Sequence, residues 1–147
     1  YKMSTTRILI PAYGINVKAL EIGLAETKHI CDAQKCNALL LVPALKEASS
    51  TALNQIFNAA QLKMLEKGSP LQFGSGQTLT MCSPLTMKNH RTDGVIFAVF
   101  ASEKIIDKAE CAPATKGLVV VTWNNEDAKK WEASTSPKVV SAAEIDG

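Results

Sequence analysis

Four continuous apolar runs constrain the fold of this chain more than any other feature. They cover residues 7–10, 38–42, 95–100 and 118–122, and each is followed by a turn or a helix-start signal. A strand with one face in water alternates apolar and polar residues, whereas a continuous apolar run is typical of a strand covered on both faces. The runs therefore predict a parallel sheet with helices packed on both sides.

Segments with helical spacing separate these runs. In residues 16–34, Val17, Leu20, Leu24 and Cys31 fall on one face, and Asn16 is a suitable N-cap. We predict a second helix from a cap at Ser49 or Ser50 to about Lys67, with a buried stripe listed here: Leu53, Ile56, Phe57, Ala60, Met64 and Leu65. Two further helices are expected, one after an N-cap at Ser102 and one after Asn124 or Asn125.

The alternation of strands and helices predicts a three-layer α/β/α, Rossmann-like domain that spans residues 1–147. We expect a mostly parallel sheet of about five strands, near 6–11, 37–43, 77–83, 94–101 and 117–122. An extra edge strand or a hairpin is expected near 71–74 or 138–141. The segment 71–82 is open to two interpretations, a hairpin or one strand with a bulge.

Composition and charge narrow the function classes. Apolar residues make up 46% of the chain, and 16 basic residues nearly balance 14 acidic ones. Arginine is the preferred reader of phosphates and bases, and only Arg7 and Arg91 are present, so we expect no nucleic-acid partner. No stretch reaches the ~18 apolar residues of a membrane span, so we expect no membrane partner and a cytoplasmic location.

The four cysteines, Cys31, Cys36, Cys82 and Cys111, form no C-x-x-C pair and have no histidine at ligand spacing. On a continuous helix, Cys31 and Cys36 would point about 140° apart. We therefore interpret the cysteines as buried thiols of a reducing compartment and predict no metal site.

A ligand site in such a sheet is expected outside the carboxyl ends of the strands. The residues that follow the four strand ends, and that we expect to contact a ligand, are Tyr13, Gly14, Asn16, Lys46, Ser102, Glu103, Trp123 and Asn124. Helix N-termini would supply amide donors and Lys46 a positive charge, which suits a small polar or nucleotide-like ligand. The hydroxyl and amide residues among them are equally explained as helix caps.

The motifs of familiar cofactor sites are missing. No G-x-G-x-x-G follows the first strand, and Pro43 stands where the second strand of a dinucleotide fold would end in an acidic residue. The chain also contains neither a G-x-x-x-x-G-K-[ST] loop nor a G-x-S-x-G elbow. We therefore predict no cofactor.

The candidates for catalysis are Glu103, Ser102 and His90. Glu103 follows a central strand, where a carboxylate can act as a general acid or base, and His90 can exchange protons near neutral pH. If Trp123 is exposed, its ring would stack on a ligand. If it is buried, it would cover the carboxyl edge of the sheet. Three functions stay open: a ligand-binding domain, an interaction or homo-oligomeric module, and a small hydrolase of a nucleotide-like substrate that uses Glu103.

Overall fold

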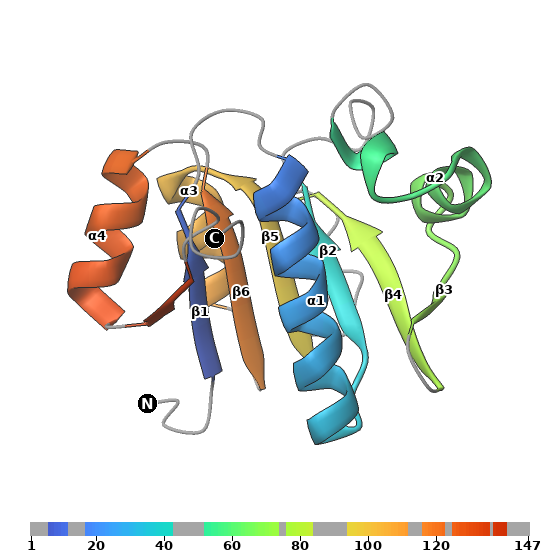
Figure 1. The fold of residues 1–147 in the computed structure, drawn as a ribbon, viewed down its shortest axis with the longest axis horizontal. Helices are drawn as coiled ribbons and strands as arrows, with labels where there is room; N and C mark the ends of the chain where they lie inside the picture. Colours follow the sequence, from blue (N-terminus) through green and yellow to red (C-terminus); the bar gives the residue numbers. More distant parts are fainter. Residues whose placement is uncertain are drawn as a thin grey trace.

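The computed structural model describes residues 6–11, 17–42, 52–73, 76–83, 94–111, 116–122, 125–135 and 137–140. Seven strands form one sheet in the order β3-β4-β2-β5-β6-β1-β7 (Figure 1). The strands are β1 (Thr6–Ile10), β2 (Ala38–Leu41), β3 (Leu71–Phe73), β4 (Gln77–Cys82), β5 (Val95–Ala101), β6 (Gly117–Thr122) and β7 (Lys138–Val139). All neighbouring strands are parallel except β3 and β4, which confirms the prediction of a mostly parallel sheet. The antiparallel pairing of β3 with β4 confirms the hairpin interpretation of 71–82.

Helical segments cover both faces of the sheet. The helix α1 (Val17–Gln34), the 3-10 turn η2 (Ala52–Gln55) and α2 (Ala59–Glu66) pack on one face, and α3 (Glu103–Glu110) and α4 (Asn125–Thr135) pack on the other (Figure 1). Alternate strand residues serve the two cores: Ile8 and Ile10 contact the α1 side, and Leu9 contacts the α3 side. Because both faces of the central strands are buried, β2, β5 and β6 are apolar at almost every position. The three-layer α/β/α prediction is confirmed.

The long helix α1 lies close against the two central strands β5 and β6. At the crossing point, a Cβ atom built on Gly23 would lie 2.5 Å from Cε1 of Phe97 and 3.0 Å from Cγ2 of Val121. The Thr27 hydroxyl donates a hydrogen bond of 2.7 Å to the Gly23 carbonyl oxygen, so this buried hydroxyl has a partner within the helix. Gly23 therefore sets how near α1 approaches the sheet.

A charged cluster ties the opposite layer to the sheet. Arg7 of β1 donates to Glu110 of α3 through Nε at 2.8 Å and through Nη2 at 3.0 Å. The indole Nε1 of Trp131, on α4, lies 3.4 Å from the same carboxylate. The Arg7 and Glu110 side chains are only 21% and 25% exposed, so this bidentate pair is largely screened from water. It links one strand to both helices of its layer.

The predicted second helix is wrong as a single element. The chain instead forms η2, and then α2 begins after Asn58, whose extended backbone (φ −78°, ψ 172°) interrupts helical geometry. Asn58 Oδ1 accepts from the Gln61 amide at 2.8 Å, and Gln61 Oε1 accepts from the Asn58 amide at 2.9 Å. This capping box satisfies two amides that an unbroken helix would have used, so it stabilises a new start. The predicted caps Ser49 and Ser50 lie outside the described residues.

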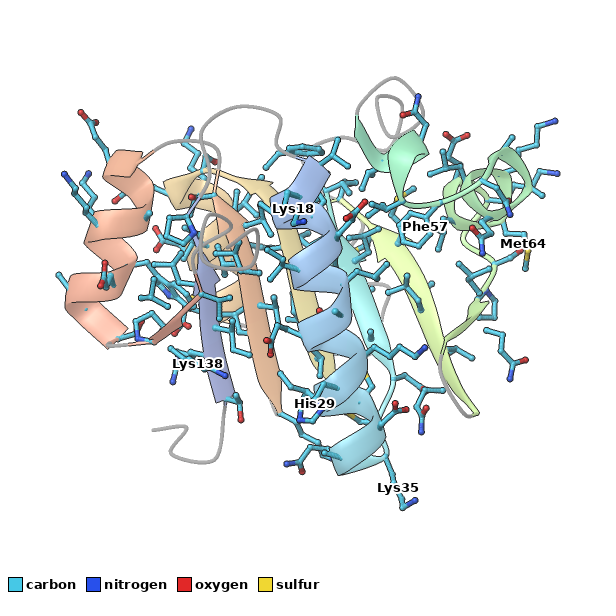
Figure 2. All side chains as sticks on the ribbon, viewed as in Figure 1. Lys18, His29, Lys35, Phe57, Met64 and Lys138 are labelled. Carbon is cyan, nitrogen blue, oxygen red and sulfur yellow. The ribbon has the colours of Figure 1, made fainter. Side chains whose placement is uncertain are left out.

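The break also changes which side of α2 faces the core. Leu62 and Leu65 are buried, whereas Ala60 is exposed and Met64, predicted to be buried, is 40% exposed and points away from the sheet (Figure 2). Phe57 lies between η2 and α2 and packs inward as predicted. The predicted buried face of α2 was wrong because the helical spacing was counted without interruption from η2 across the break at Asn58.

The helix α1 ends at Gln34, so Cys36 is not helical. The 140° separation that a continuous helix would impose on Cys31 and Cys36 therefore does not apply. Cys31, Cys36 and Cys82 are buried, as predicted, whereas Cys111 is exposed. That last part of the cysteine prediction is wrong, because Cys111 follows the last turn of α3 at the surface.

Candidate functional site

The carboxyl ends of the parallel strands meet at one edge of the sheet, the upper edge in Figure 1. At two places on this edge, neighbouring strands continue into helices on opposite faces. One place lies between β1, which leads to α1, and β6, which leads to α4; the other lies between β2, which leads to η2, and β5, which leads to α3. Such reversals are where open α/β sheets bind their ligands.

The end of β5 is irregular at the second of these reversals. Its register with β6 pairs Ala98 with Val120 and Ala101 with Thr122, so β5 has one extra residue. Phe100, inside this bulge, has a φ of 51°, which is uncommon for a bulky aromatic residue. Bulges and left-handed residues of this kind collect near functional sites, where they re-aim the chain.

The bulge changes the side of the sheet on which the last residues of β5 pack. Val99 and Phe100 are consecutive, yet both pack in the core on the α1 side, and Ala101 returns to the α3 side. Phe100 is only 7% exposed, so this packing offsets the local strain of about 1–3 kcal/mol. The irregularity positions the start of α3 relative to β6.

Three of the parallel strands end in a residue with a hydroxyl side chain or are followed directly by one. Ser83 follows β4, Ser102 follows β5, and Thr122 ends β6. Ser83 is 7% exposed and Thr122 is fully buried, while Ser102 is partly exposed. Ser83 and Thr122 were missed by the sequence reasoning. For Thr122, the available signal was a hydroxyl that closes the apolar run 118–122.

Ser102 is the N-cap of α3, as predicted, but its side chain does not perform that role. Its backbone is extended (φ −89°, ψ 173°), and its carbonyl oxygen accepts from the Ile106 amide at 3.0 Å. The side chain makes no capping hydrogen bond, in contrast to Asn58 at the start of α2. The alternative explanation of Ser102 as a conventional capping hydroxyl is therefore not supported by its geometry.

Glu103 lies in the first turn of α3, and its carboxylate faces α4. Its Oε2 accepts from Lys130 Nζ at 3.2 Å, with the two side chains 57% and 66% exposed, so the pair contributes little to stability. The groove between the two helices has a volume of about 230 Å³ and is lined by Glu103, Ile106, Asp107, Lys130, Trp131 and Ser134. Glu103 thus contributes to the surface of the helical layer.

Most of the residues expected at the site lie outside the described part of the chain: Tyr13, Gly14, Asn16, Lys46, His90, Trp123 and Asn124. Their convergence, and a hydrolytic role of Glu103 with His90, remain predictions. One basic residue that the sequence reasoning missed is Lys18, in the first turn of α1 at the carboxyl edge (Figure 2). His29 is exposed near the opposite end of the same helix.

Within the described ranges, no three His, Cys, Asp or Glu side chains gather in a way that could hold a metal ion. Among the helices of the same residues, none combines the length and apolar character needed to cross a membrane. Comparisons of the chain with protein-family models, with curated proteins and with solved structures each found no match.

Proposed function

We propose that this protein binds a small polar, nucleotide-like ligand at the carboxyl edge of its sheet. The observation that carries the proposal is the Ser102 side chain at the reversal between β2 and β5. It stands at the N-terminus of α3 and makes no capping hydrogen bond there. A hydroxyl in this position can hydrogen-bond to a ligand without giving up a bond that the fold needs.

The polarity of the edge supports an anionic or strongly polar ligand. The helices α1, α3 and α4 each follow a strand of the sheet and begin at this edge, so their first-turn amides face it (Figure 1). Helix N-termini carry partial positive charge, which favours phosphate or carboxylate groups. Lys18, in the first turn of α1, adds a basic side chain at the same edge.

The first test is thermal denaturation of the full chain with nucleoside mono-, di- and triphosphates, free nucleosides and inorganic phosphate at millimolar concentration. A binding compound is expected to raise the unfolding temperature in proportion to the logarithm of its concentration. If every compound leaves the unfolding temperature unchanged, the proposal is refuted.

The second test locates the site with a pair of cap variants. We expect Ser102→Ala to weaken the binding found in the first test by about five- to tenfold, at a stability cost well below ~1 kcal/mol, because no capping bond is lost. The matched control Asn58→Ala breaks a real capping box, so it should cost about 1 kcal/mol and leave affinity unchanged. Equal affinity of wild type and Ser102→Ala in calorimetric titration would place the ligand elsewhere.

A further inference from the structure

The end of α1 closes in a defined backbone motif. After Gln34, Lys35 adopts a left-handed conformation with φ 52°, and the Cys36 amide donates back to the Cys31 carbonyl oxygen at 3.1 Å. A left-handed residue followed by this six-to-one hydrogen bond is the Schellman ending of a helix. The motif brings together the side chains of the residues joined by that bond, and here both are cysteines.

The two thiols form a buried pair. Cys31 is fully buried and Cys36 is 8% exposed, and both belong to the apolar core between α1 and the sheet. The Cys36 side chain is near enough to that of Cys31 to raise its pKa. Both cysteines are in the free thiol form. The helix ending thus keeps the two thiols close to each other, and a disulfide can form without backbone movement only between cysteines that the backbone already holds close.

We propose that Cys31 and Cys36 are a modification site, at which the free thiols are converted reversibly into an intramolecular disulfide by a small disulfide oxidant such as glutathione disulfide. The thiolate of Cys36, the more exposed of the two, attacks one sulfur of the oxidant and releases one glutathione thiolate. The thiolate of Cys31 then attacks the Cys36 sulfur of the mixed disulfide and releases the second. The disulfide bond of the oxidant breaks, that of the protein forms, and two electrons and two protons pass to glutathione.

The surroundings of the pair govern how fast it reacts. Burial, together with the neighbouring Cys36, raises the pKa of Cys31 from 9.0 to about 12, so little thiolate is present at neutral pH. We therefore expect slow closure that accelerates up to about tenfold per pH unit on the alkaline side of neutrality. The pair lies where β2 begins, at the edge of the sheet opposite the strand carboxyl ends (Figure 1), so this inference does not depend on the proposed ligand site.

The sequence between the cysteines provides a direct assay. Trypsin cleaves after lysine, and Lys35, which extends into solvent beyond α1 (Figure 2), lies between them. The folded full chain is incubated in glutathione buffers of increasing oxidising ratio, alkylated and digested without reductant. We expect an intact mass loss of two hydrogen atoms and a covalent link between peptides 29–35 and 36–46.

Variants test whether the motif causes the pairing. Cys82→Ala and Cys111→Ala are expected to retain the link, and Cys36→Ala to abolish it. Lys35→Gly keeps the left-handed conformation and should close at the wild-type rate, whereas Lys35→Val, with a β-branched side chain, should close at least several-fold more slowly. These two variants lack the tryptic site, so they are followed by intact mass.

Two outcomes would overturn the inference, and neither needs a variant to fold. The first is the absence of the link in folded wild-type protein under buffers that oxidise the urea-unfolded chain. The second is a link that joins Cys31 or Cys36 to another cysteine.

Discussion

Replacing Gly23 by alanine should destabilise the protein, although alanine is the better helix former. Alanine in a helix interior is favoured over glycine by about 1 kcal/mol. Gly23, however, is the point where α1 touches the sheet, and an added Cβ would lie 2.5 Å from Cε1 and 2.8 Å from Cζ of Phe97. Carbon atoms normally rest about 3.5–4.0 Å apart, so the helix or the ring must move by roughly 1 Å.

The size of the effect follows from those two contributions. Overpacking of a well-filled core costs about 1–3 kcal/mol, and the upper part of that range applies because Phe97 is fully buried between α1 and the strands. Subtracting the helix-propensity gain leaves a net loss of about 2 kcal/mol. For a chain of this length, that loss lowers the unfolding temperature by roughly 4–8 °C.

Urea unfolding followed by circular dichroism measures the loss as a shift of the midpoint at constant slope. The matched control is Ala25→Gly at an exposed position of the same helix, which should cost about 1 kcal/mol through propensity alone. In the double variant with Phe97→Leu, part of the clash should disappear, which gives a coupling free energy of about 1 kcal/mol. A Gly23→Ala protein as stable as wild type would refute the close packing of α1 on β5.

Three further predictions test other parts of the fold. Glu110→Ala leaves the half-buried guanidinium of Arg7 without its bidentate acceptor, so we expect urea unfolding to show a loss of about 2 kcal/mol; an unchanged midpoint would contradict the cluster. In the same assay, Leu62→Ala should lower the free energy of unfolding by about 2–4 kcal/mol and Met64→Ala by less than ~1 kcal/mol. The reverse order would support the single long helix instead. Burial raises the pKa of Cys82 from 9.0 to about 12, so this thiol ionises at lower pH in the unfolded chain than in the folded protein. The free energy of unfolding should therefore fall above pH 9, by up to ~1.4 kcal/mol per pH unit, and it should fall less in Cys82→Ala. Equal pH profiles for the two proteins would contradict this prediction.

The sheet could be predicted because strands that are buried on both faces have continuous apolar runs in their sequence. Each of the four apolar runs lies in a described parallel strand or extends one residue beyond it, and the helices α1, α3 and α4 begin within one residue of the predicted caps. The weak segments near 71 and 138 were correctly assigned to the edges, where strands are short. These features depend on periodicity within a few residues, which the sequence contains directly.

The candidate site was predicted less completely, because its distinctive features depend on contacts between distant elements. No local pattern shows that Phe100 occupies a left-handed bulge, since the mismatch arises from its pairing with β6. Ser102 has the sequence of an ordinary cap, and only the structure shows that its hydroxyl makes no such bond. The proximity of Cys31 and Cys36 likewise depends on where α1 stops.

The sequence by itself determined the class of the fold: a mostly parallel sheet, buried on both faces, with helices between its strands. The tertiary structure alone decided the strand order, the two reversals at the carboxyl edge, the orientation of α2 and the pairing of Arg7 with Glu110, residues 103 positions apart. The physical reason is that residue periodicity records whether a surface is buried, but not which surface buries it. That choice is made by the packing of all the elements together, where the position of a single glycine or the end of a single helix selects the partner.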